Sequence, residues 1–120
     1  MIGYFALALG GALGSVARYL IGKRISEVSR SRIPLGTGLV NLTGAILLGL
    51  LTSLDIGDNL YALAGDGFLG AYTTFSTFMY EGFQLFQDRE KLNALVYIVG
   101  TIILGVLGFL AGLTIGGIWL

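Results

Sequence analysis

Charged residues divide this chain into long apolar stretches. No Asp, Glu, Lys or Arg occurs in residues 1–17, 33–54, 67–80 or 92–120. A helix needs roughly 20 mostly apolar residues to cross the hydrocarbon core of a bilayer. The pattern therefore predicts four transmembrane helices, with bounds near Ile2–Gly22, Pro34–Ser53, Leu60–Phe86 and Asn93–Trp119. Because the connecting segments are short, residues 1–120 are expected to form a single all-α transmembrane domain.

Composition supports an integral membrane protein and excludes several classes of enzyme. Hydrophobic residues make up 55% of the 120 positions, and charged residues only 12%, against about 25% in soluble globular proteins. The chain has no Cys and no His, which removes disulfides, thiol chemistry, the usual zinc sites and imidazole acid–base catalysis. The formal net charge is zero, so no basic surface is expected for nucleic acid. We expect no enzymatic activity.

The basic residues are distributed unevenly between the predicted loops. Four of them, Lys23, Arg24, Arg30 and Arg32, follow the first span, and Arg89 and Lys91 precede the fourth, whereas residues 54–59 contain none. Since Lys and Arg concentrate in cytoplasmic loops, this distribution favours both basic loops in the cytoplasm and both termini outside.

Small residues recur at helical spacing in three of the spans. Gly10 and Gly14 lie four apart in the first span, Ala45 and Gly49 in the second, and a run of three glycines at 108, 112 and 116 follows one face of the fourth. Small residues let membrane helices approach closely, so these positions predict a tight bundle. Four helices enclose little space, and we therefore expect an oligomer, most simply a dimer, with a substrate path near the junction of two copies.

The third predicted span departs most from an ordinary membrane helix. Residues 65–78 read GDGFLGAYTTFSTF, which places glycines and hydroxyl side chains near the middle of the bilayer. Irregular backbone is tolerated at that depth only where it is buried in protein or lines a cavity, and its free carbonyls can then coordinate a cation. We expect a broken third helix, with the carbonyls of Gly70 and Thr73 as candidate ligands for a hard monovalent ion.

Three side chains, two just after the glycine-rich stretch and one in the second span, are candidates for binding an anion. Phe75 and Phe78 are three residues apart, hence expected on one helix face, and the positive edges of aromatic rings attract small anions without trapping them. Packing or lipid contact is the alternative for both rings. Asn41, in the second span, offers two N–H donors and one acceptor. It is expected to act either as a clamp between helices or as a donor to an anion.

Three further polar residues within the spans have competing interpretations. Arg18 lies near the end of the first span, where it can anchor the helix at the interface or pair with an acid. In the fourth span, Tyr97 and Thr101 are four apart and share a face with Gly105. They can continue a line of hydroxyl donors, or Thr101 can bond to its own helix backbone, as Thr commonly does in membranes.

Three motifs together resemble the Fluc (CrcB) fluoride channel family across nearly the whole chain. They are GGALGSVARY at 10–19, GTGLVNLTGAILLG at 36–49 and GFLGAYTTFSTF at 67–78. The resemblance implies an antiparallel, dual-topology dimer in a prokaryotic plasma or inner membrane, which lets cytoplasmic fluoride leave the cell passively. It also implies two fluoride pores and a structural sodium ion at the dimer centre.

By this resemblance, Phe75 and Phe78 line the pore and the Asn41 amide donates to fluoride. The Gly70 and Thr73 carbonyls of both subunits hold the sodium ion. Ser76, Thr77, Tyr97 and Thr101 resemble members of a polar track, although Gly105 stands where a hydroxyl is expected. Glu81 resembles a vestibule carboxylate, with a solvated helix cap as its alternative.

The uneven basic residues conflict with dual topology, which expects balanced Lys and Arg on the two faces. Either the bias is too weak to fix orientation and the chain forms a homodimer, which we favour, or it pairs with an oppositely oriented homologue. A small proton-coupled multidrug antiporter is the main alternative function. Such an antiporter needs a titratable carboxylate in its first span, which has none before Arg18, although Asp66 in the third span is a possible substitute. A membrane assembly factor without transport activity is a third possibility.

Overall fold

A computed structural model describes residues 2–30 and 32–119, and it is built from helices. Three long helices are α1 (Ile2–Val28), α2 (Leu35–Thr52) and α6 (Lys91–Trp119). Between α2 and α6 the chain forms a segmented helix: α3 (Asp58–Tyr61), the π-helix η1 (Ala62–Leu69), α4 (Gly70–Tyr72) and, after a non-helical stretch, α5 (Ser76–Gln87). The all-helical architecture predicted from the charge-free stretches is confirmed.

Within the described residues, three helices are long and apolar enough to cross a membrane: α1, α2 and α6. The segment predicted as the third span is absent from this set because it is divided into short helices, the longest of which, α5, has 12 residues. The coarse prediction of a helical membrane protein agrees with the structure.

Glycines bring two pairs of helices into backbone contact, as their spacing predicted. A Cβ on Gly10 would overlap the carbonyl of Leu63, and one on Gly14 would overlap that of Phe68, so α1 packs directly against η1. On the other side, a Cβ on Gly112 of α6 would overlap the carbonyl of Ile46 in α2. Close approach of this kind is how membrane helices gain van der Waals contact without a hydrophobic driving force.

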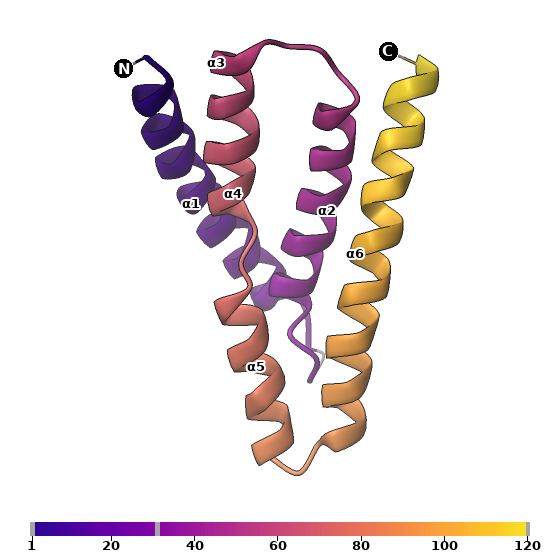
Figure 1. The fold of residues 1–120 in the computed structure, drawn as a ribbon. Helices are drawn as coiled ribbons and strands as arrows, with labels where there is room; N and C mark the ends of the chain where they lie inside the picture. Colours follow the sequence, from indigo (N-terminus) through magenta and orange to yellow (C-terminus); the bar gives the residue numbers. More distant parts are fainter. Residues whose placement is uncertain (1, 31, 120) are drawn as a thin grey trace.

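The two basic segments lie at the same end of the bundle. The turn from α1 to α2 and the hairpin from α5 to α6 are both there, whereas the two termini and α3 lie at the opposite end (Figure 1). An ion pair between Arg32 and Glu90, with nitrogen and oxygen 2.8 Å apart, connects the two turns. Six of the seven basic residues, all except Arg18, therefore lie in the segments at one end of the bundle.

Most large apolar side chains face outwards. The buried residues form two small clusters, one of Phe78, Leu85, Ala94 and Tyr97 and one of Val40, Leu69 and Tyr72. The second cluster and Phe78 lie near the interruption between α4 and α5, whereas Leu85 and Ala94 lie near the α5–α6 hairpin. The outward apolar surface is suited to lipid or to another protein subunit.

Candidate functional site

The candidate site surrounds the interruption between α4 and α5. Thr73 is extended, with φ −83° and ψ 156°, and helix resumes at Ser76. The interruption frees backbone groups that a continuous helix would pair, and an unpaired group in hydrocarbon costs several kcal/mol. The side chain of Asn41 meets this need for Thr74. Its Nδ2 donates to the Thr74 carbonyl at 2.9 Å, and its Oδ1 accepts from the Thr74 N–H at 2.8 Å.

This pairing realises the interhelical clamp that was one of the two interpretations of Asn41. It leaves one N–H of the amide without a partner among the described residues, because Asn41 Nδ2 carries two hydrogens and only one is used. Clamping and donation to an anion are therefore compatible. The amide is held in one orientation by the Thr74 backbone, which fixes where its remaining N–H points.

The carbonyl oxygens of Gly70 and Thr73 are also left free by the interruption. In the described ranges no hydrogen bond reaches either oxygen: the Thr74 N–H, which would reach Gly70 in a continuous helix, binds Asn41 instead. Both residues line a cavity of about 480 Å³ between α2 and the segmented helix, which we call the carbonyl cavity. Asn41, Tyr61 and Asp66 also line it. Neutral carbonyls with no donor suit a hard cation, so this donor set fits a sodium ion.

The two phenylalanines meet at a second cavity, of about 220 Å³, which we call the aromatic cavity. It is lined by Asn41, Thr73, Thr74, Phe75, Phe78 and Thr101. The ring centroids of Phe75 and Phe78 are 6.2 Å apart with a 58° tilt. Their environments differ, because Phe78 is 4% exposed whereas Phe75 is 75% exposed. Phe75 precedes α5 rather than lying on its face, which accounts for the difference.

Tyr97 packs against Phe78 without lining the aromatic cavity, and it carries a buried hydroxyl near Thr37 and Glu81. Its ring packs edge-on against Phe78 at 5.2 Å between centroids, and the residue is only 3% exposed. Its hydroxyl oxygen is buried and has no hydrogen-bond partner within the described part of the chain. Such a group carries a desolvation cost unless a bound ion or water satisfies it.

Thr101 connects the aromatic cavity to a third, largely apolar cavity of about 230 Å³ between α2 and α6, which Tyr97 also lines. No hydrogen bond is formed by its hydroxyl in the portion that the structure describes, unlike that of Thr114, which donates to the Leu110 carbonyl of its own helix at 2.9 Å. The alternative in which Thr101 bonds to its own backbone is therefore not adopted. Gly105 has no atom within 4 Å of the position a Cβ would occupy.

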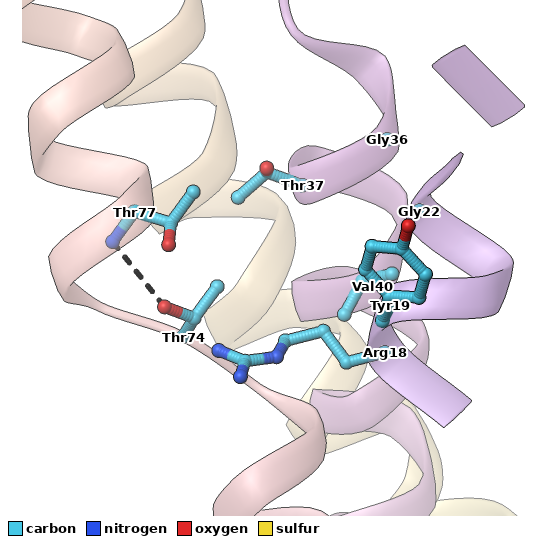
Figure 2. A pocket seen from close by; sticks show the side chains of 8 residues that line it. All are labelled: Arg18, Tyr19, Gly22, Gly36, Thr37, Val40, Thr74 and Thr77. Atoms are coloured by element: carbon cyan, nitrogen blue, oxygen red, sulfur yellow. Dashed lines mark hydrogen bonds between the residues drawn. The ribbon is translucent and has the colours of Figure 1, made fainter. Parts of the chain in front are cut away.

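A fourth cavity, of about 290 Å³, lies at the other side of the interruption and is called the vestibule here. Its polar lining comes from Arg18, Tyr19, Thr37, Thr74 and Thr77. Figure 2 shows the Arg18 side chain extending from α1 towards Thr74, where the Thr77 N–H donates to the Thr74 hydroxyl at 3.3 Å. Arg18 forms no ion pair within the described residues. Thr74 is shared with the aromatic cavity, so the two spaces adjoin.

Glu81 is neither a free cap nor an open carboxylate. It is half-buried and accepts a hydrogen bond of 2.6 Å from the hydroxyl of Thr37. Two contacts were not predicted from the sequence: the Thr37 hydroxyl bound to Glu81, and the Thr74 backbone bound to Asn41. Thr37 lies four residues before Asn41 on the same helix, a spacing that could have identified it. Ser76, by contrast, is exposed and lines none of the cavities described above.

The chain is similar to known proteins over most of its length. Residues 5–113 match the family described as CrcB-like protein, Camphor Resistance (CrcB). A protein of Clostridium acetobutylicum named fluoride-specific ion channel FluC 2 is 57% identical over 109 residues, covering 91% of this chain and 93% of its own length. Relatives with fluoride-specific ion channel names occur in Mycobacterium bovis and Aquifex aeolicus, each 42% identical. They cover 91% and 90% of this chain, and 86% and 94% of the relatives.

Replacing Asn41 should destabilise the interruption. Asn41→Leu keeps the side-chain size but leaves the N–H and carbonyl of Thr74 without their partner, at an expected cost of about 2–4 kcal/mol in unfolding free energy. Unfolding in detergent, together with amide hydrogen exchange at residues 73–76, measures this loss. Thr114→Val is the matched control, because its hydroxyl bonds only within its own helix. Equal stability of the two variants would contradict the clamp.

Proposed function

Because this chain belongs to the CrcB family, we propose that it is a fluoride channel that lets cytoplasmic fluoride leave the cell passively and so protects it from fluoride toxicity. The observation that carries the proposal is the set of uncharged donors around the aromatic cavity: the free N–H of Asn41, the hydroxyl of Thr101 and the buried hydroxyl of Tyr97 nearby. The family is one of ion channels and not of enzymes.

The chemistry of the donors suits fluoride, a small and strongly hydrated anion. A pore must replace its water with several hydrogen-bond donors, yet hold it weakly enough for release. Amide, hydroxyl and aromatic-edge donors meet both needs, whereas a buried Lys would retain the anion. Fluoride formed by dissociation of HF in the cytoplasm is driven outwards by the membrane potential, worth about 2.3 kcal/mol per charge per 100 mV.

The proposed path runs from the vestibule to the aromatic cavity and on towards α6. Arg18 raises the local anion concentration in the vestibule, with Glu81 held at its edge by Thr37. Phe75, Phe78 and Asn41 form the narrow part. Tyr97 and Thr101 continue the polar track, and Ser76 and Thr77 join it from the start of α5. This assignment is supported by the sharing of Thr74 and Thr101 between neighbouring cavities.

We also propose a structural sodium ion bound by the carbonyls of Gly70 and Thr73. In the described residues no N–H or O–H group donates a hydrogen bond to either carbonyl oxygen. Both oxygens are neutral, hard ligands, which supports a sodium ion at this place. The ion would bind the carbonyl oxygens that the interruption leaves without hydrogen bonds. Its role would be structural, with no chemical step during fluoride movement.

The channel is proposed to be an antiparallel dimer, in which the two halves of the third span, α3–α4 and α5, together cross the bilayer. The 75% exposure of Phe75 supports a dimer, because an aromatic pore residue must be enclosed to exclude lipid and water. The surrounding membrane is proposed to be a prokaryotic plasma or inner membrane. A homodimer is favoured, with pairing to an oppositely oriented homologue as the alternative that the basic residues suggest.

A proton-coupled antiporter is not favoured. Curated relatives over nine-tenths of this chain are named as fluoride-specific ion channels. No carboxylate lines the aromatic cavity or the vestibule. Glu81, at the edge of the vestibule, accepts a hydrogen bond from Thr37, and Asp66 lies outside the proposed fluoride path.

Phe75→Ile should abolish fluoride efflux. The substitution keeps an apolar side chain but removes the aromatic edge that faces the anion. An electrode that follows fluoride release from proteoliposomes measures the effect, with chloride release as the selectivity control and size-exclusion chromatography as the check on the dimer. Phe83→Ile is the control: Phe83 is also an exposed phenylalanine but lies within α5, and this variant should retain efflux. Undiminished efflux in Phe75→Ile would show that the aromatic pair takes no part in conduction. Phe78→Ile is expected to act similarly but also to lower stability, because Phe78 is buried.

Tyr97→Phe separates conduction from folding. The substitution removes a buried hydroxyl that has no protein partner in the described residues, so stability should stay equal or rise. A donor lost from a passing anion should lower fluoride efflux about tenfold or more, since hydrogen bonds to charged groups contribute about 1.5–3 kcal/mol. Efflux and unfolding are measured on the same preparation. Lower stability with unchanged efflux would assign the hydroxyl a structural role only.

Orientation in cells tests the antiparallel arrangement. The chain has no cysteine, so a single Cys introduced at Asp55, in the exposed loop before α3, reports which side of the membrane that loop faces. Homodimers require labelling from both sides in about equal amounts. One fixed orientation, in cells with no second homologue, would contradict antiparallel pairing.

A further inference from the structure

Asp66 is a carboxylate within the third span to which the fluoride path assigns no role. It lies on η1 between Gly65 and Gly67, both of which are buried, while Asp66 itself is exposed on the protomer surface. Ionisable side chains inside membrane spans are costly and usually pair with an opposite charge or face a cavity. Asp66 faces two cavities and has no ion pair or hydrogen bond with any residue in the described ranges.

One of these spaces is the carbonyl cavity, of about 480 Å³, which Asp66 lines together with Gly70 and Thr73. The other, of about 290 Å³, opens between the start of α1 and α3, where Tyr4, Asp58 and Asn59 line it. Asp66 is the one residue that the two linings share. It therefore lies where a route from the membrane surface would join the carbonyl cavity.

No basic side chain of the described residues forms an ion pair with Asp66. Six of the seven Lys and Arg residues fall within 23–32 and 89–91, in the segments at the end of the bundle opposite to α3 (Figure 1). The seventh, Arg18, lines the vestibule and neither of the two cavities that Asp66 lines. The polar groups around both cavities are carboxylate, amide, phenol, hydroxyl and backbone carbonyl. The oxygen atoms among these polar groups, together with the negative charge of Asp66, suit a hard cation.

We infer that Asp66 draws a monovalent cation of the sodium class into the carbonyl cavity and raises its occupancy at the carbonyls of Gly70 and Thr73. This role rests on the proposed sodium site but is distinct from it, because Asp66 acts through its charge and the carbonyls act as ligands. Two neutral carbonyls from each protomer hold an ion only through their dipoles. A full negative charge in the same partly desolvated cavity adds a long-range attraction.

The inference predicts a specific change in sodium dependence. Asp66→Asn keeps the shape of the side chain and removes its charge, so the sodium concentration that gives half-maximal stabilisation should rise on the order of tenfold, the size of one unit-charge interaction across a partly desolvated gap. Asp55→Asn is the matched control. It removes the same charge from the exposed loop before α3, which lines neither cavity, and should leave the midpoint unchanged.

The experiment measures the melting temperature of the purified full-length protein as sodium chloride replaces choline chloride at constant ionic strength. A shifted midpoint in Asp66→Asn, with the wild-type midpoint in Asp55→Asn, supports the inference. An unchanged midpoint overturns it. A melting temperature lowered equally at every sodium concentration also overturns it, because that result assigns the Asp66 carboxylate a structural role that is independent of sodium.

Wild-type fluoride efflux, measured on the same preparation, keeps this test separate from the proposed function. Efflux without any sodium dependence of melting would overturn both the carbonyl site and the role of Asp66 while leaving the channel function intact. Sodium-dependent melting without fluoride efflux would overturn the channel function alone.

Discussion

Backbone polar groups are costly to leave unpaired in the hydrocarbon of a bilayer, and at the interruption before α5 one side chain, Asn41, pairs both backbone groups of Thr74. The two hydrogen bonds between Asn41 and Thr74 supply both the donor and the acceptor that a helix would have supplied. Because Asn41 belongs to α2, the same bonds also fix the interruption against that helix. The aromatic and carbonyl cavities open on either side of this pairing, so both proposed ion sites depend on it.

The proposed sodium ion and the proposed fluoride ion would then bind next to the same interruption in the third span. Breaking a helix exposes carbonyls from the half that ends and N–H groups from the half that begins. Gly70 lines the carbonyl cavity and Thr101 the aromatic cavity, whereas Asn41 and Thr73 line both. A cation and an anion can each find complementary groups within a few residues of the chain, without a buried charged side chain at the narrow part.

Helix positions and helix contacts could be predicted well from the sequence, because both depend on local composition. Charge-free stretches marked the long helices, and glycine spacing identified Gly10, Gly14 and Gly112 as contact positions. The π-helix was not predicted, since nothing in residues 62–69 distinguishes i→i+5 from i→i+4 bonding. The partners of Asn41 and Glu81 were not predicted either. Both bonds join residues more than 30 positions apart, and the choice between a clamp and a free donor requires knowing what lies opposite.

The π-helix η1 can accommodate a change in the number of residues in the third span. A π-helix holds more residues per turn than an α-helix, because its hydrogen bonds run i→i+5 instead of i→i+4. Loss of one residue between Ala62 and Leu69 can be absorbed by returning a turn to α-helical bonding, with the flanking segments kept in place. Insertions and deletions among related chains should therefore be better tolerated here than at the α2–α6 contact, where the backbones of two regular helices pack closely at Gly49 and Gly112.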